Sequence, residues 1–206
     1  ETLFNKSPDI QREIEYFKEK DLPFSWIVGP TMPQDMLSEA LTNLGLKKKE
    51  QNHCMLLNLH GFRKKARYIP GFRIQQALTK SSIEDVGKVY ANESCNKEHI
   101  EEYFGKISKL AFHGSDPIQL FVGYLNEEPA IVGELYLGAG IAGFKCFVAS
   151  KYKDRNKELI IDLSIKMLLK ARQQSYHFAV VKSFKEQYLI YKQLGFKKYC
   201  EFSRYQ

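Results

Sequence analysis

The chain has 206 residues and a net charge of +7, and 44% of its residues are hydrophobic and 27% charged. This composition excludes long disordered segments, the lack of any run of 18 apolar residues excludes a transmembrane helix, and the start at Glu1 leads us to expect no signal peptide. The positive charge suits an anionic cofactor that carries phosphate groups, and equally a weak attraction to nucleic acid or a membrane surface.

Residues 1–60 alternate between helical and strand-like patterns, which predict a small N-terminal α/β domain. An amphipathic helix begins at Ser7-Pro8, because Ser and Pro are preferred at helix starts. A short strand over 24–29 and a second helix over 33–44 follow. The runs LKKKEQ and HCMLLNL have the patterns of two strands, which we expect to pair.

Residues 61–72, GFRKKARYIPGF, are basic, contain Gly and Pro and lack periodicity, so they predict a linker. A second domain is expected over 73–206. It begins with the strand RIQQAL, and two helices over about 81–93 and 97–110 carry apolar residues at spacings of three and four. Three strands then form a meander, IQLFVGYL, AIVGELYL and IAGFKCFV.

The last part of the chain alternates helices and strands. After the basic turn SKYKDRNK come a helix over 157–174, the strand HFAVV, a short helix over 184–193 and the strand FKKYCEFSRY. The turn joins a strand to a helix N-terminus, where the first backbone N–H groups lack partners within the helix and the helix dipole is positive. This corner is a natural anion site, although a charged turn before a helix is more often a plain connector.

The C-terminal part of the chain resembles a known family. It is similar to the coenzyme-A-binding core of the GNAT-type N-acetyltransferases. The similarity lies in the strand that leads through Arg155-Asn156-Lys157 into a helix, and in the later segments HFAVV and YKQLGF, the latter at 191–196. The family pattern at the turn is Arg/Gln-x-x-Gly-x-Gly/Ala. The chain matches it at Arg155 and departs from it at Glu158 and Ile160. The resemblance covers about residues 73–206, and residues 1–60 are similar to a truncated first half of the same fold.

The resemblance implies an α+β mixed-sheet, acyl-CoA N-acyltransferase-like fold, with acetyl-CoA as co-substrate. It implies that the strand before the corner splays from its neighbour, so that the backbone of Phe147, Val148 and Ala149 holds the pantetheine arm. Ser183 is expected either to contact the cofactor or to cap the next helix. The residues expected around the pyrophosphate are Arg155, Asn156, Lys157, Glu158, Leu159 and Ile160.

The reaction needs an acid and a base, because the departing thiolate takes up a proton and the attacking amine loses one. The resemblance implies that Tyr191 is the acid, since a phenol with a pKa of about 10 stays protonated at neutral pH; the alternative is a tyrosine that only packs on its helix. Glu134 is the expected base, because its apolar neighbours indicate a half-buried setting that raises a carboxyl pKa, although a strand Glu is more often solvent-facing. Glu93 and Glu98 are further candidates.

Other sites are not expected. The four cysteines form no C-x-x-C pair and predict reduced thiols in a cytoplasmic protein, and the five histidines show no metal-ligand spacing. The sequence lacks a G-x-S-x-G elbow, a Walker-type loop and a dinucleotide fingerprint, which argues against hydrolase and nucleotidase functions. It also lacks a base-reading motif, so nucleic-acid binding is not expected.

The sequence therefore favours an N-acetyltransferase that moves an acetyl group from acetyl-CoA directly to a primary amine, on a small molecule or a protein. The alternative is an inactive interaction module of the same fold that has lost acyl-CoA binding, because Glu158 and Ile160 replace the small residues of the family pattern. The identity of the acceptor and the oligomeric state stay open.

Overall fold

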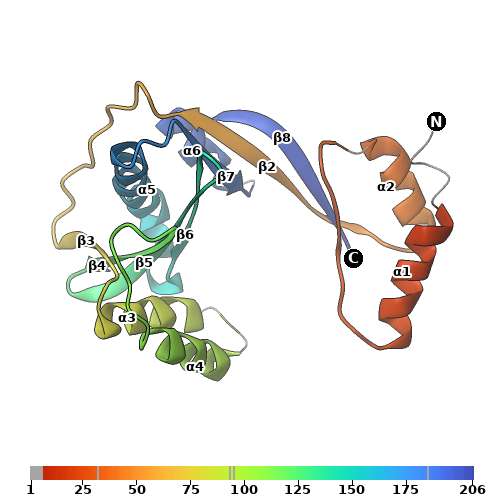
Figure 1. The fold of residues 1–206 in the computed structure, drawn as a ribbon, viewed down its shortest axis with the longest axis horizontal. Coiled ribbons are helices and arrows are strands. Elements are labelled where there is room, and N and C mark those ends of the chain that lie inside the picture. The colour runs from red at the N-terminus through yellow and green to blue at the C-terminus, as the bar shows by residue number, and fades with distance from the viewer. Residues whose placement is uncertain (1–6, 32, 93, 95, 185) are drawn as a thin grey trace. The chain divides into compact units, whose positions relative to one another are not determined.

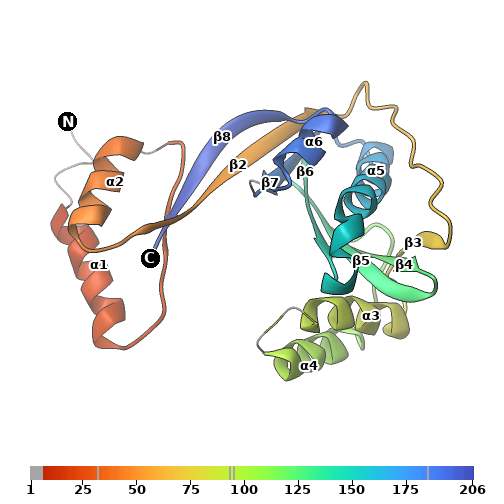
Figure 2. The ribbon, with the colours of Figure 1, turned by 180° about the vertical axis from the view of Figure 1, so that it is seen from behind.

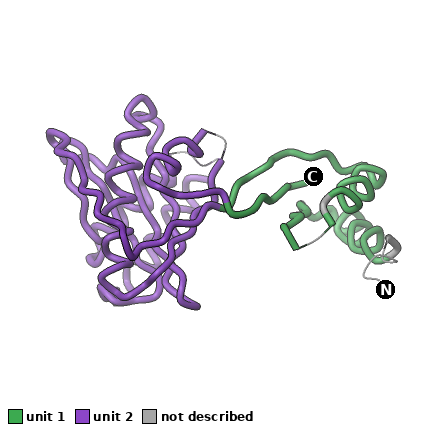
Figure 3. The backbone as a smooth tube through the Cα atoms, turned by 90° about the horizontal axis from the view of Figure 1, so that it is seen from above, with its two compact units in different colours: residues 1–54, 199–206 green, residues 55–198 purple. Residues whose placement is uncertain are grey.

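The computed structural model describes residues 7–206 except Met32, Glu93, Cys95 and Lys185. The predicted base candidate Glu93 therefore lies outside the described residues. The chain forms two compact units, residues 1–54 with 199–206 and residues 55–198 (Figure 3).

The first unit combines both ends of the chain. It contains α1 (Ser7–Glu19), β1 (Trp26–Val28), α2 (Gln34–Asn43), the first part of β2 (Lys48–Asn58) and most of β8 (Lys197–Tyr205). β8 pairs antiparallel with β1, with Tyr205 opposite Trp26. The core of the unit consists of Ile14, Val28, Leu37, Leu41, Leu46 and Tyr205.

The observed strands differ from the expectations in two ways, one in the grouping of the C-terminal residues and one in the number of strands over 46–59. The last eight residues group with the N-terminal unit rather than with residues 73–198, because β8 pairs with β1 and Lys47 exchanges two backbone hydrogen bonds with Gln206. The runs LKKKEQ and HCMLLNL do not form two paired strands; most of both lies in the single strand β2.

The second unit is a mixed sheet with helices on both faces (Figures 1 and 2). Its strand order is β2-β7-β6-β5-β4-β3, antiparallel from β3 to β6 and parallel between β6 and β7. This confirms the α+β mixed-sheet prediction. Its elements are β3 (Phe72–Gln76), α3 (Lys80–Ala91), α4 (Lys97–Ile107), β4 (Ile118–Leu125), β5 (Glu128–Gly138), β6 (Ile141–Val148), the 3-10 helix η1 (Ser150–Arg155), α5 (Asn156–Gln173), β7 (Phe178–Ser183) and α6 (Tyr188–Leu194).

Alternation along the central strands creates two cores. On β4, Phe121 packs with the α5 and α6 side, whereas Leu120 and Val122 pack with α3 and α4. On β5, Ile131 joins the first cluster and Val132 the second. This is the period of two that places successive strand side chains on opposite faces of a sheet.

The helix ends and the hairpin turn of this unit are determined by residues close together in the sequence. Thr79 and Ser82 form a reciprocal capping box at the start of α3. The β4–β5 turn places Asn126 and Glu127 at positive φ, the conformation of a tight hairpin whose twist matches the flanking strands. Gly195 ends α6 with a φ of 104°, which favours glycine.

The segment 61–71 contains neither helix nor strand, but it is part of the second unit rather than a separator between domains. We call it the strap. Phe62 and Ile69 are buried in the core beneath α5 and α6, and the Arg67 N–H donates to Asp162 Oδ1 at 3.1 Å. These two apolar anchors are the reason that an aperiodic, basic segment folds onto a domain instead of linking two.

Candidate functional site

The sheet of the second unit opens between β6 and β7. The two parallel strands pair from Ile141 opposite Phe178 to Phe144 opposite Val181. β6 then continues to Val148 and stays paired with β5, whereas none of these described β6 residues after Phe144 has a partner in β7. One edge of β6 is therefore free over 145–148.

The backbone direction at this edge selects which residues face the opening. The Ala149 N–H donates to the Ala130 carbonyl at 2.9 Å, so it points toward β5. Because successive backbone groups of a strand point to opposite edges, Val148 and Cys146 face the open side, and Phe147 faces β5. Of the three residues expected to hold a pantetheine arm, Val148 alone presents its N–H and C=O to the opening.

The corner after β6 is tighter than a simple turn. The 3-10 helix η1 leads directly into α5, and the Asn156 N–H already donates to the Lys153 carbonyl. Arg155 forms an ion pair with Glu158 through its Nε. Lys157 is exposed. The corner thus offers the first-turn amides of α5 that follow Asn156 and the exposed ammonium of Lys157. Lys151 and Lys153 of η1 are also exposed, with Lys151 paired to Glu128, and the Arg155 charge is compensated by Glu158.

Leu159 and Ile160 do not line the corner. Both side chains are fully buried in the core that α5 forms with the sheet. Ile160 therefore does not block the approach of an anion, because it points into the protein and leaves the outer surface of the first turn clear. Its large side chain here is a core residue.

Tyr191 lies on α6 behind the opening and is 1% exposed. Its ring packs edge-to-face on Phe144 at 5.8 Å and on Phe196 at 5.9 Å. Burial raises the pKa of Tyr191 well above its ordinary value, which keeps the phenol protonated and makes it a weaker acid.

Ser183 ends β7 beside the opening and is fully buried. Its hydroxyl donates to the Phe184 carbonyl at 3.0 Å. The expected capping role is wrong, because α6 begins at Tyr188 with Gln187 at its N-cap. The next residue, Phe184, is 47% exposed, so one aromatic ring is accessible just after β7.

Glu134 is the centre of a polar cluster on the opposite face of the sheet, with a side chain that is 13% exposed. It accepts hydrogen bonds from the Tyr90 hydroxyl at 2.6 Å and from the Tyr136 hydroxyl, and its Oε1 lies 3.0 Å from Lys145 Nζ. Burial first, and the bond to Glu134 second, raise the pKa of Tyr90 above its ordinary value. We call these four residues the Glu134 cluster.

Aromatic rings border the Glu134 cluster. Tyr90 stacks on Phe104 of α4 at 5.7 Å and lies 5.1 Å from the ring of Phe147 on β6. Lys145 Nζ lies 5.5 Å from the centroid of the Tyr90 ring. The cluster therefore occupies a partly apolar setting between α3, β5 and β6, and it contains both a carboxylate and a cation. Its β6 member, Lys145, lies three residues before Val148.

Sequence reasoning missed three members of this cluster, Tyr90, Tyr136 and Lys145. Tyr136 follows Glu134 by two residues and lies on the same face of β5. Lys145 lies directly opposite Glu134 on the neighbouring strand β6. Alternation within the strand was therefore a usable signal for Tyr136, whereas Lys145 required the strand register. Glu98 is exposed on α4.

The described residues contain no group of three or more His, Cys, Asp or Glu side chains placed to hold a metal ion. None of the helices in the described part of the chain is long and apolar enough to cross a membrane.

No family model and no curated protein matches this sequence. Several solved structures, however, are similar to the structure of this chain. The GCN5-related N-acetyltransferase from Kribbella flavida superimposes with a TM-score of 0.69 at 10% identity, over 97% of this chain and 75% of that one. A GCN5-related N-acetyltransferase from Sphaerobacter thermophilus gives 0.67 at 10% identity, over 95% and 65%. A tandem GNAT protein from the clavulanic acid biosynthesis pathway gives 0.65 at 10% identity, over 95% and 67%.

Proposed function

We propose that this chain, which has the fold of the GCN5-related N-acetyltransferases, transfers an acetyl group from acetyl-CoA to a primary amine. The observation that carries the proposal is the free edge of β6, where pairing with β7 stops at Phe144. An extended amide-containing arm can pair with such an edge as an added strand does. The pantetheine part of coenzyme A contains two amides and has the required shape.

The donor would bind along Val148, with its diphosphate at the first turn of α5. The amides of that turn supply the positive end of a helix, and Lys157 supplies an exposed cation. Arg155 adds a second cation when its guanidinium leaves Glu158 and binds the phosphate oxygens instead. Both contacts are charge-assisted hydrogen bonds from arginine to an anion. Ile160 leaves this surface clear because it is buried.

The Glu134 cluster would receive the acceptor amine. A primary amine is protonated at neutral pH and must lose a proton before it attacks the thioester carbonyl. Glu134 can accept that proton directly or through the Tyr90 hydroxyl at 2.6 Å. The aromatic rings of Tyr90, Phe104 and Phe147 favour a cationic amine near this face. Tyr191 would donate a proton to the departing coenzyme A thiolate, since burial keeps its phenol protonated.

The decisive experiment measures donor binding. Titration with acetyl-CoA should raise the melting temperature progressively, since a ligand that binds only the folded state stabilises it by mass action. The substitution Val148→Pro removes one N–H at the open edge without removing a bond to β5, so it should weaken binding. A flat response to millimolar acetyl-CoA would exclude the enzyme.

An interaction module of the same fold is the second candidate, and one contact favours it. Arg155 is already paired with Glu158, so the cation expected to bind the diphosphate is compensated within the protein. The variant Glu158→Gln separates the two candidates. In an enzyme it frees Arg155 and increases the affinity for acetyl-CoA, whereas in a module neither the wild type nor the variant binds the donor.

A further inference from the structure

The strap carries a basic surface over α5 and α6 that the reaction itself does not require. It is held from both sides, because Phe62 and Ile69 are buried and Arg172 donates to the Phe62 carbonyl. Between these anchors Lys64, Lys65 and Arg67 are all exposed. The strap therefore holds a short run of cations at a defined place on the second unit.

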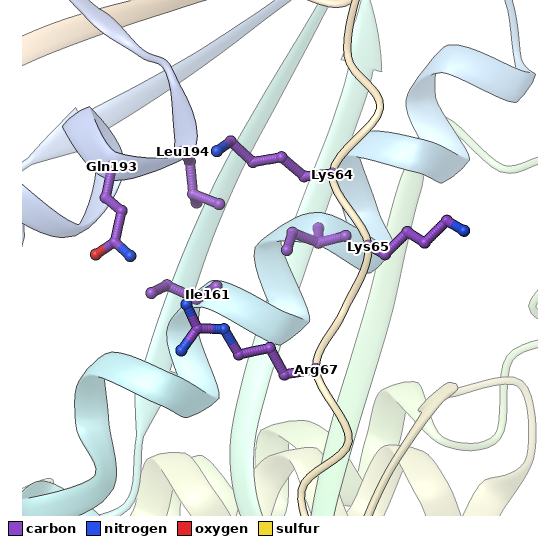
Figure 4. Close-up of a pocket in the computed structure, with 7 residues that line it drawn as sticks. Lys64, Lys65, Arg67, Ile161, Gln193 and Leu194 are labelled. Atoms are coloured by element: carbon purple, nitrogen blue, oxygen red, sulfur yellow. The ribbon is translucent and has the colours of Figure 1, made fainter.

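A small cavity of about 150 Å³ lies between the strap and the two helices. Its floor is apolar, made of Ile161 and Ile165 from α5 and Leu194 from α6, and Gln193 adds a carboxamide. Figure 4 shows the Lys64 ammonium directed toward Leu194 and the Arg67 guanidinium directed toward Ile161. Lys65 also lines the cavity, but its ammonium points away from Leu194 and Ile161. A cavity of this size takes one group of a larger ligand, since whole ligand sites are several times larger.

The charges around the cavity are mainly positive. Among the described residues, neither the Lys64 ammonium nor the Arg67 guanidinium makes a hydrogen bond or an ion pair within the protein. The nearby carboxylate of Asp162 is buried and accepts the backbone N–H of Arg67 rather than its side chain. Glu158 is paired with Arg155. The charge of the Arg67 guanidinium is partly compensated by its attraction to the Asp162 carboxylate. The two cations of Lys64 and Arg67 beside an apolar floor suit a ligand that joins a phosphate to a flat, weakly polar ring.

The cavity adjoins the corner where the donor diphosphate is proposed to bind. Ile161 lies five residues after Asn156, which is roughly 7.5 Å along the axis at about 1.5 Å per residue. Lys157 precedes Ile161 by four residues and so shares its face of α5. In coenzyme A the 3′-phosphate, the 5′-diphosphate and the adenine are all attached to one ribose. A ribose at the corner can therefore place its adenine in the cavity and its 3′-phosphate beside the cations of the strap.

We propose that Lys64 and Arg67 of the strap bind the 3′-phosphate of the coenzyme A donor, with its adenine against Ile161, Ile165 and Leu194. This inference rests on the proposed function, because it needs the donor to bind at the start of α5. It makes the strap a specificity element that distinguishes coenzyme A from donors that lack the 3′-phosphate.

The test compares the affinities of acetyl-CoA and 3′-dephospho-acetyl-CoA by isothermal titration calorimetry at one fixed ionic strength. Wild-type protein should bind acetyl-CoA about tenfold more tightly, which corresponds to about 1.4 kcal/mol. The variants Lys64→Gln and Arg67→Gln should each reduce this preference and leave the affinity for the dephospho compound unchanged. Lys65→Gln is the matched control, with the same loss of charge from the same strap, and should keep the preference.

Three results would overturn the inference. Equal wild-type affinities for the two donors would show that the 3′-phosphate is not bound, while leaving the proposed function intact. An equal loss of preference in Lys65→Gln would show that the effect is only the general positive field. Binding of neither donor would remove the proposed function together with this inference, so the two failures are distinguishable.

Discussion

The substitution Glu134→Gln tests the centre of the Glu134 cluster, because it removes the negative charge and keeps the shape of the side chain. In the native protein the carboxylate accepts from Tyr90 at 2.6 Å and from Tyr136, and it lies 3.0 Å from Lys145 Nζ. If Glu134 is the general base, the variant should lose about 10²- to 10⁴-fold in kcat.

The expected loss of stability is much smaller and can be worked from the contacts. The Lys145 side chain is 55% exposed, so its ion pair contributes less than about 1 kcal/mol. A hydrogen bond to a charged group is worth about 1.5–3 kcal/mol and a neutral one about 0.5–1.5 kcal/mol, so each of the two tyrosines loses about 1 kcal/mol. A total of about 2–3 kcal/mol is expected in the free energy of unfolding, measured by urea titration.

The matched control is Lys145→Met, which removes the same ion pair and leaves the carboxylate and both phenol bonds in place. It should keep kcat within about tenfold of the wild type, since the proton acceptor is intact. The assay is the release of coenzyme A thiol with a panel of primary amines. The reasoning would be refuted if Glu134→Gln kept the wild-type rate, or if Lys145→Met lost as much activity as Glu134→Gln.

Three further outcomes are expected. Val148→Pro should weaken acetyl-CoA binding about 2- to 13-fold, the equivalent of one net hydrogen bond of about 0.5–1.5 kcal/mol, and an unchanged dissociation constant by calorimetry would contradict the edge-pairing model. Tyr191→Phe keeps the ring contacts in the core, so the free energy of unfolding should change by only about 1 kcal/mol while kcat falls at least about tenfold; a kcat equal to that of the wild type would leave Tyr191 a packing residue. Burial raises the pKa of Asp162, so its carboxyl group binds a proton more tightly in the native state than in the unfolded chain. The free energy of unfolding therefore falls as the pH rises above about 3.9, the ordinary pKa of an aspartate. Asp162→Asn should therefore raise the free energy of unfolding at pH 8, with a gain that shrinks toward pH 4; a gain independent of pH in urea titrations would show another cause.

Much of the second unit was predictable because its signals are local. The helix expected over 157–174 is α5, Asn156–Gln173, and the three-strand meander is present as β4, β5 and β6. Apolar residues recur with a period of two in a strand and of 3.6 in a helix, and these spacings depend only on residues close together in the chain. They can therefore be read without knowledge of the tertiary structure. The hairpin turns obey the same rule, since a positive φ at Asn126 is a local preference.

The site was less predictable because its residues meet across the sheet. The buried position of Ile160 depends on which face of α5 meets the sheet, and a pattern match to small residues carries no information about that. The Arg155–Glu158 pair needs the 3-10 helix that joins β6 to α5. Lys145 reaches Glu134 because the β5–β6 register places them opposite each other.

By itself, the sequence determined the order and type of the elements from β3 to α6 apart from η1, because each of them has its own characteristic spacing of apolar residues. Only the tertiary structure decided that the C-terminal strand pairs with β1, that the strap packs on a domain and that β6 parts from β7 after Phe144. Each of these depends on contacts between segments far apart in the chain. Such contacts form wherever the folded protein buries the most apolar surface and leaves the fewest backbone groups unpaired.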